Sequence, residues 1–350
     1  MTEMRIGRHE IGPGRPTFIV AELSANHNQD FDKAVELVHA AKAVGADAVK
    51  LQTYTADTMT IACDRAEFRV GGGTLWDGRL LHDLYQEAFT PWDWQPRLKE
   101  VAEGLGLECF STPFDSTAVD FLEAMSVPAH KVASFELIDI PLLRKIGQTR
   151  RPVIMSTGMA TLAEIDDAVQ ALRASGTTEL ALLRCTSSYP APPEEADLRT
   201  IPHLADAFGV IAGLSDHTLG IAVPIAAVAL GARIIEKHFT LSRAVPGPDS
   251  AFSLEPQEFK QMVDGVRVAE RALGDVRFGP TLAERASRAH RRSLFVVEDV
   301  AAGERLTERN VRSIRPAHGL PPKLLPDVLG RRAARAIARG TPLSWDLIAP

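Results

Sequence analysis

The sequence is poor in cysteine and contains no long apolar run. Its 350 residues include only three cysteines, Cys63, Cys109 and Cys185, which are widely spaced and form no C-x-x-C pair. This pattern excludes a disulfide framework and a zinc knuckle, and it is typical of a reducing cytoplasm. No apolar stretch approaches the roughly 18 residues of a membrane span, and residues 1–16 lack the apolar core of a signal peptide. We therefore expect a cytoplasmic protein.

An excess of positive charge is also missing. The chain has 39 basic and 45 acidic residues, which gives a net charge of −6. A broad surface for nucleic acid or for an anionic membrane is therefore not expected. The net charge does not exclude a local pocket that binds an anion. With 45% hydrophobic and 24% charged residues, the composition excludes a disordered chain and provides for a sizeable core. We expect small molecules rather than nucleic acids or membranes as binding partners.

What the sequence does contain is a regular alternation of short apolar runs and segments with helical spacing of apolar residues. Continuous apolar strands that alternate with helices indicate a parallel sheet buried on both faces. Eight such units predict a (β/α)8 TIM barrel, which we assign to residues 1–280. The expected strands are residues 17–23, 47–53, 107–112, 130–134, 151–157, 179–185, 210–216 and 233–239.

One connection in this barrel is unusually long. A helix is expected near residues 91–104, and the stretch 56–90 before it is rich in glycine and aromatic residues. Loops of this length in compact domains are usually functional. We expect a lid or a substrate wall, with a plain surface excursion as the alternative.

The chain changes character after Gly274. Residues 281–292 are polar and basic, which is typical of a linker helix, and residues 293–350 consist of short strands and turns. Segments 300–311 and 337–348 share apolar, glycine and hydroxyl residues at equal offsets, which indicates a small domain with internal pseudo-symmetry. A domain this small is marginally stable alone, so it is expected to dock.

Two lysines occur inside strands that are otherwise apolar. Lys50 shares one strand face with Gln52 because they are two residues apart, and Lys131 lies in the fourth strand. A buried lysine is costly without a partner, so each lysine either pairs with Glu22 or Glu136 or helps to bind an anion. Hydroxyl groups at neighbouring strand ends favour an anion pocket suited to a small phosphorylated acid. These hydroxyls belong to Thr112, Ser134, Ser156 and Ser215.

Two histidines end the last two strands of the predicted barrel. His217 and His238 would be neighbours there, and two imidazoles with water and substrate could hold an exchangeable divalent ion such as Mn²⁺ or Mg²⁺. The alternative is a pair of hydrogen-bonded core histidines. Glu22 and Glu136 could serve as acid and base, or each could merely neutralise a lysine.

Several motifs at these strand ends resemble the sialic acid synthase family. They are AELSANHN, GADAVKLQTYTADTMT, STPFD, KVASFEL, MSTGMATL, CTSSYPAP, GLSDHTLGI and IIEKHFT. The tail RRSLFVVEDVAAGERLTERNVRSIRP resembles the antifreeze-like SAF domain of that family, here residues 293–350. Within the family, LQTYTADT, LWDGRLLHDLYQEAFTPW, ASFELIDIPLL and GPDSAFSLEP are most similar to the members that form pseudaminic acid.

The resemblance implies a reaction and a role for each matching residue. Phosphoenolpyruvate would condense with 2,4-diacetamido-2,4,6-trideoxy-L-altrose by C–O cleavage, giving pseudaminate and phosphate. His217 and His238 would bind the metal, Mn²⁺ with Mg²⁺ or Co²⁺ as alternatives, and Glu22 and Glu136 would handle protons. The phosphoenolpyruvate site would comprise Lys50, Gln52, Thr112, Lys131, Ser134, Ser156 and Ser215. The sugar site would comprise Tyr189, Asp249 and Arg315, the last supplied by the partner subunit of a domain-swapped homodimer.

One position departs from the family pattern of the neuraminate synthases. Ser187 stands two residues before Tyr189, where those enzymes have asparagine. This difference weakens the alternative of an N-acetylneuraminate synthase, and a legionaminate synthase remains a second alternative. A Schiff-base aldolase with Lys50 or Lys131 as nucleophile is the alternative from another enzyme class. A non-catalytic carbohydrate-binding protein is a third, although polar residues at all eight strand ends argue against it.

Overall fold

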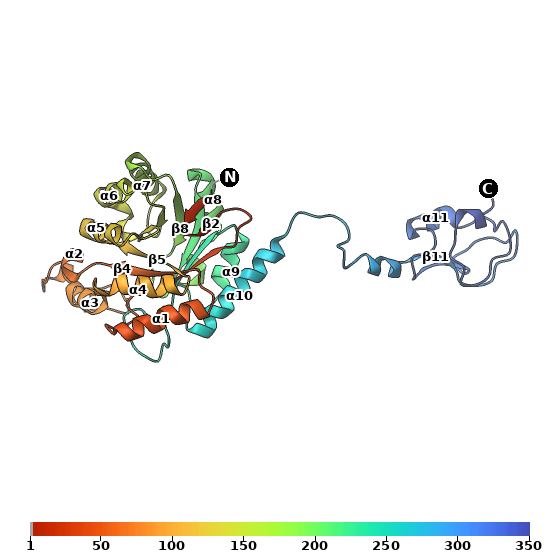
Figure 1. The fold of residues 1–350 in the computed structure, drawn as a ribbon. Helices are drawn as coiled ribbons and strands as arrows, with labels where there is room; N and C mark the ends of the chain where they lie inside the picture. Colours follow the sequence, from red (N-terminus) through yellow and green to blue (C-terminus); the bar gives the residue numbers. More distant parts are fainter. Residues whose placement is uncertain (1–2) are drawn as a thin grey trace. The chain divides into compact units, whose positions relative to one another are not determined.

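The computed structural model describes residues 3–350 and divides the chain into two units after Gly274 (Figure 1). Each unit has its own apolar core. No helix in residues 3–350 has both the length and the apolar character that crossing a bilayer requires.

The first unit is a closed barrel of eight parallel strands, as predicted. Strand β10 pairs with both β9 and β3, and this pairing closes the barrel. Helices surround the sheet (Figure 1), so the strands are apolar on both faces. The strands are β3 (Phe18–Glu22), β4 (Ala48–Thr53), β5 (Glu108–Pro113), β6 (His130–Val132), β7 (Val153–Ser156), β8 (Leu180–Cys185), β9 (Ile211–Asp216) and β10 (Ile234–His238).

Several of the helices begin where the sequence offers capping groups. Asp30 accepts the backbone N–H of Lys33 at 3.1 Å before the first helix, and Thr161 and Glu164 form a reciprocal capping box before α7. The barrel helices are α1 (Phe31–Ala43), α4 (Trp94–Gly104), α5 (Ser116–Ala124), α6 (Ile140–Gln148), α7 (Leu162–Ser175), α8 (Thr200–Phe208), α9 (Ala222–Ala229) and α10 (Pro256–Leu273).

A hairpin at the amino end of the barrel was not predicted. Strands β1 (Met4–Ile6) and β2 (His9–Ile11) pair antiparallel. Ile6 and Ile11 are buried in one cluster with Phe18 and Ile234, the first residues of β3 and β10. The hairpin therefore covers the end of the barrel where the strands start, and the opposite end remains for the polar residues.

The long connection after β4 contains short elements of its own. These are α2 (Ala56–Met59), a 3-10 helix (Ala66–Phe68) and α3 (Leu81–Ala88). Between the last two, residues 69–80 form a turn closed by a bridge between Arg69 and Leu80. The connection is thus an ordered feature of the carboxyl end of the barrel.

The second unit contains two antiparallel strands, β11 (Ser293–Val296) and β12 (Val311–Ile314). The two similar segments meet, because Val300 and Ile337 exchange backbone hydrogen bonds of 2.9 and 2.8 Å. The helix predicted over 281–292 is wrong: only Ala286–His290 is helical, as a 3-10 turn. This segment is exposed throughout, so it has no apolar face to stabilise an α-helix. The remaining elements are two 3-10 helices, Pro322–Leu324 and Trp345–Leu347, and α11 (Leu325–Val328).

Candidate active site

Two buried lysines and two buried carboxylates form the centre of the polar carboxyl end. Lys50 on β4 lies 2.5 Å from Glu22 on β3 and 3.7 Å from Glu236 on β10. Lys131 on β6 lies 3.9 Å from the same carboxylate of Glu236. Pairing with Glu22, the alternative to an anion pocket, is therefore present for Lys50, whereas Lys131 pairs with Glu236 rather than with Glu136. Glu236 lies between the two ammonium groups.

The predicted hydroxyl groups surround these lysines. Lys50 donates a hydrogen bond of 3.2 Å to Thr112, and Lys131 donates one of 2.7 Å to Ser156. Ser215 donates to Glu236 at 3.1 Å. The structure thus brings residues from seven strands to one polar cluster, which has the donors that a phosphate or carboxylate requires.

Gln52 and Ser134 lie at the edge of the same cluster. Gln52 donates a 3.0 Å hydrogen bond to Glu22, and Ser134 accepts the backbone N–H of Gly158 at 3.1 Å. A Cβ atom at Gly158 would collide with the hydroxyls of both Ser134 and Ser187. A glycine is required here because two strand-end loops approach its backbone closely.

The electrostatics of the site give its glutamate side chains different pKa values. Burial raises the pKa of Glu22 to about 7, and it also raises the pKa of Glu136 to about 7. Burial opposes ionisation of Glu236 as well, but Lys131 and Lys50 hold its pKa below the ordinary value. Burial lowers the pKa of Lys131, and the nearby Glu236 offsets this only in part. Glu22 and Glu136 can thus exchange protons near neutral pH, whereas Glu236 stays ionised.

The two histidines meet as predicted, with ring centroids 5.3 Å apart. Nδ1 of His217 lies 2.9 Å from the carbonyl oxygen of Thr186. Because a carbonyl can only accept, Nδ1 carries a proton, and in the neutral ring Nε2 then keeps its lone pair for a ligand. Burial and then the neighbouring His217 hold the pKa of His238 well below its usual value, so this imidazole is neutral.

This donor set fits a weakly held divalent ion. In residues 3–350 no group of three or more His, Cys, Asp or Glu side chains is arranged to hold a metal. The protein would therefore supply two imidazole ligands, and water and substrate would fill the other positions. Nδ1 of His238 is buried without a hydrogen-bond partner among the described residues, so this nitrogen is available to a ligand.

An aromatic surface flanks the two histidines. Tyr189 packs on His217 with ring centroids 4.5 Å apart and on Phe252 at 5.2 Å. Asp249 lies nearby and accepts a hydrogen bond from Ser24, and burial raises the pKa of Asp249 to about 6. The structure thus brings two of the three predicted sugar-site residues to the carboxyl end of the barrel.

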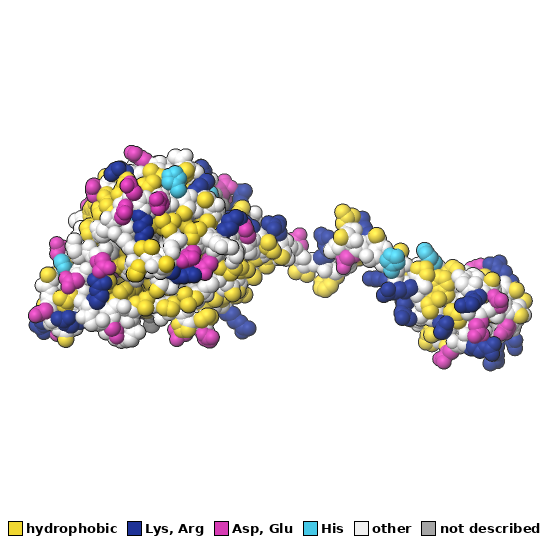
Figure 2. Space-filling view, turned by 90° about the horizontal axis from the view of Figure 1, so that it is seen from below, with side chains coloured by type: hydrophobic (Ala, Val, Ile, Leu, Met, Phe, Trp, Pro, Cys, Tyr) yellow, Lys and Arg dark blue, Asp and Glu magenta, His cyan; other side chains and the backbone are white. Residues whose placement is uncertain are grey.

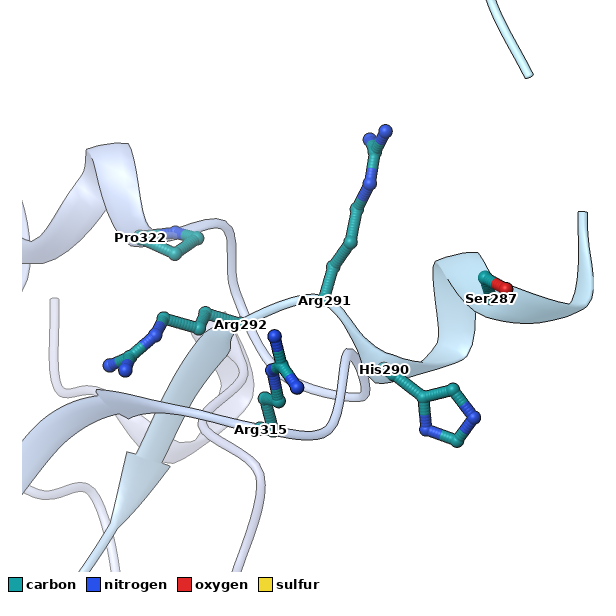
Figure 3. Close-up of a pocket in the computed structure, with 6 residues that line it drawn as sticks. All are labelled: Ser287, His290, Arg291, Arg292, Arg315 and Pro322. Atoms are coloured by element: carbon teal, nitrogen blue, oxygen red, sulfur yellow. The ribbon is translucent and has the colours of Figure 1, made fainter. Parts of the chain in front are cut away.

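The third predicted sugar-site residue, Arg315, lies in the second unit, just after β12. It is exposed and lines a cavity of 630 Å³ with His290, Arg291 and Arg292 (Figure 3). Other basic side chains gather on the visible face of this unit (Figure 2). The structure describes Arg315 and this cavity within the second unit alone.

Glu236 and Gly158 are site residues that the sequence placed at strand ends but to which it gave no role. Glu236 is two residues before His238 on the same strand, so alternation already placed both side chains on one face. The signal for Gly158 was only its position after the β7 strand end. The role of Gly158 depends on which loops approach its backbone, and the local sequence pattern does not indicate those contacts.

The fold and the site together define a barrel that carries a buried polar cluster beside two imidazoles at its carboxyl end, which is where barrel enzymes have their active sites. Residues 37–278 match the NeuB family and residues 291–349 match the SAF domain. The chain belongs to the NeuB family of sialic acid synthases, which condense phosphoenolpyruvate with a second substrate.

Characterised relatives match almost the whole chain. A pseudaminic acid synthase of Helicobacter pylori is 46% identical over 334 residues, which are 95% of this chain and 98% of that protein. A pseudaminic acid synthase of Campylobacter jejuni is 43% identical over 340 residues, 97% of this chain and 98% of that protein. The crystal structure of an N-acetylneuraminic acid synthetase from Leptospira borgpetersenii is similar with a TM-score of 0.73 and 31% identity, covering 82% of this chain and 95% of that one.

Proposed function

We propose that this protein is a pseudaminic acid synthase. It condenses phosphoenolpyruvate with 2,4-diacetamido-2,4,6-trideoxy-L-altrose and releases pseudaminate and phosphate. The observation that carries the proposal is the cluster of Lys50, Lys131 and surrounding hydroxyls next to His217 and His238. The similarity to pseudaminic acid synthases over nearly the full length supports the choice of sugar.

The lysine cluster is the proposed site for phosphoenolpyruvate. The phosphate and carboxylate of phosphoenolpyruvate are negatively charged, as is Glu236, which lies 3.7 and 3.9 Å from the two ammonium groups. A bound substrate would therefore share Lys50 and Lys131 with that carboxylate. Gln52, Thr112, Ser134, Ser156 and Ser215 supply the remaining polar contacts.

In the proposed reaction, C3 of phosphoenolpyruvate attacks the aldehyde carbon of the open-chain sugar and forms the new C–C bond. Water adds to C2, and phosphate leaves with cleavage of the C–O bond. Glu22 and Glu136 move the protons, since burial raises the pKa of each to about 7. Tyr189 and Asp249 orient the sugar.

His217 and His238 are the proposed ligands of a divalent ion, Mn²⁺ with Mg²⁺ or Co²⁺ as alternatives. When bound, such an ion would polarise the aldehyde oxygen and position the attacking water. The neutral His238 and the fixed tautomer of His217 support this assignment.

We also propose that the active unit is a domain-swapped homodimer in which Arg315 of one subunit completes the sugar site of the other. Arg315 is exposed and, in the described part of the chain, forms no ion pair. Its planar guanidinium suits acyl and hydroxyl oxygens. The three cysteines are free thiols, which agrees with a cytoplasmic location.

The proposal is tested by mass spectrometry of products from a panel of open-chain acylamino sugars with phosphoenolpyruvate and Mn²⁺. The altrose-derived sugar should give the highest kcat/KM, above N-acetylmannosamine and the precursor of legionaminate, because Ser187 replaces the neuraminate-type asparagine. In ¹⁸O-labelled water, the label should enter the nine-carbon acid and not the phosphate. A higher kcat/KM with N-acetylmannosamine would contradict the sugar assignment. Inactivation by borohydride in the presence of substrate would instead support a Schiff-base aldolase.

A further inference from the structure

The turn formed by residues 69–80, here named the Trp76 turn, is held by its own hydrogen bonds. Val70 donates its N–H to the carbonyl of Arg79 at 2.9 Å, and Gly78 donates to the carbonyl of Val70 at 2.8 Å. The carboxylate of Asp77 accepts the backbone N–H groups of Gly73 and Thr74 at 2.8 and 2.9 Å. The turn can therefore present a side chain in a defined position although it belongs to a long connection.

Trp76 is the side chain that this turn presents to the barrel. Its ring centroid lies 5.8 Å from that of Tyr189, which follows β8. Its indole Nε1 donates a hydrogen bond of 3.1 Å to the carbonyl oxygen of Pro248, which precedes Asp249. Trp76 thus contacts the two loops that carry the proposed sugar-site residues, although more than 100 residues separate it from either along the chain.

The preceding residue behaves differently. Leu75 is 52% exposed, whereas Trp76 is half-buried. The turn therefore inserts a single large apolar side chain into the loop cluster. Leu75 provides a matched control because it occupies the same turn.

Trp76 is the outermost ring of a continuous aromatic series. Tyr189 lies next to it and packs on His217, and Phe252 packs on both Tyr189 and His238. In the proposed function the carbonyl carbon of the sugar lies at the imidazoles, and a sugar that extended from there along this series would bring its far end to Trp76. The far carbon of the proposed substrate is a methyl group, since that sugar lacks the 6-hydroxyl.

We propose that Trp76 is a specificity-determining residue whose indole forms an apolar wall for the 6-deoxy end of the sugar. This inference rests on the proposed function. An apolar wall favours a methyl group by burying it, but it rejects an added hydroxyl only moderately, by about 10- to 100-fold in kcat/KM. The Trp76 turn is then a substrate wall, one of the roles that its length and composition suggest.

The test compares Trp76→Ala, Trp76→Phe and the control Leu75→Ala with the wild-type protein. Each is assayed with the 6-deoxy sugar and with its 6-hydroxy analogue. Trp76→Ala should raise KM for the 6-deoxy sugar about tenfold and lower the 6-deoxy to 6-hydroxy ratio of kcat/KM about tenfold. KM for phosphoenolpyruvate should stay within about twofold, because the lysine cluster is unchanged. Trp76→Phe should retain most of the selectivity, and Leu75→Ala should match the wild type.

A binding measurement separates this role from a merely structural one. The non-reacting alditols of the two sugars are titrated calorimetrically, and Trp76→Ala should lose the preference for the 6-deoxy alditol. Unchanged selectivity of Trp76→Ala would overturn the inference while leaving the proposed function intact. An equal rise in KM for both substrates would overturn it too, since it would indicate general disruption of the loops. A wild-type protein that converts neither sugar would instead contradict the proposed function, and this inference with it.

Discussion

The two ends of the barrel both carry charged groups, but they use them differently. At the amino end, Arg267 on α10 lies 3.1 Å from Asp47 and 2.9 Å from Glu270, and all three side chains are partly exposed. At the carboxyl end, Lys50 and Glu236 are almost fully buried.

The difference lies in how completely the groups are paired. The amino-end network connects oppositely charged groups that remain in contact with water, so it costs little desolvation. At the carboxyl end, one carboxylate oxygen each of Glu136 and Glu236 is buried without a hydrogen-bond partner among the described residues. Such groups are expensive unless a ligand satisfies them. Incomplete pairing of buried charge therefore distinguishes the candidate site from a structural ion network.

The largest expected effect concerns the two histidines at the carboxyl end. His217→Ala or His238→Ala should lower kcat/KM by about 1,000-fold or more, because a polarised carbonyl and a positioned water are worth several kcal/mol. Circular dichroism and the thermal midpoint should remain close to those of the wild type. Near wild-type activity of both variants after treatment with a chelator would show that the metal assignment is wrong.

The sequence could predict this end of the barrel better than the other. Lys50 and Lys131 are conspicuous because each interrupts an apolar strand, and a parallel barrel brings strand ends together. The β1–β2 hairpin was not predicted because its strands are three residues long and alternate too briefly for a periodic signal. The contacts of Glu236 and Gly158 depend on distances between strands and loops, which local spacing does not encode.

Arg315 tests whether the carboxyl end is complete within one chain. Arg315→Ala should lower kcat/KM by about 100-fold, since the proposed guanidinium contact to the sugar would be lost. Mixing this variant with His217→Ala under conditions of subunit exchange should restore part of the wild-type rate, because each heterodimer would have one intact site. Full activity of Arg315→Ala alone would exclude a role in the reaction. An inactive variant that mixing does not rescue, despite demonstrated heterodimers, would contradict the cross-subunit arrangement.

The stability cost of a buried carboxylate without a partner can be measured at Glu136 because that cost depends on pH. Burial raises its pKa to about 7, above the roughly 4.3 of an exposed glutamate. A carboxyl group whose pKa is raised by folding stabilises the folded state fully at pH values below its pKa in the unfolded state. This stability is lost as the pH rises towards the folded-state pKa of about 7. Glu136→Gln should therefore be more stable than the wild type at pH 8, by about 2 kcal/mol, and similar to it below pH 4.5.

The measurement is urea unfolding followed by tryptophan fluorescence at the two pH values. Glu270→Gln is the matched control at the amino end, where the carboxylate accepts a 2.9 Å hydrogen bond from Arg267. That variant should be less stable than the wild type at pH 8. Stabilisation of both variants at pH 8 would contradict the proposed difference in charge pairing between the two ends of the barrel.

The smallest expected effect concerns the amino-end network itself. Arg267 also donates a 2.8 Å hydrogen bond to the carbonyl of Thr17, so it connects α10 to the start of β3. Arg267→Ala should lower the free energy of unfolding by about 1–2 kcal/mol and leave kcat/KM within about twofold of the wild type. Arg271→Ala, on the same helix and exposed, should change stability by less than about 0.5 kcal/mol. A tenfold loss of kcat/KM in Arg267→Ala without loss of stability would show that both ends of the barrel serve the reaction.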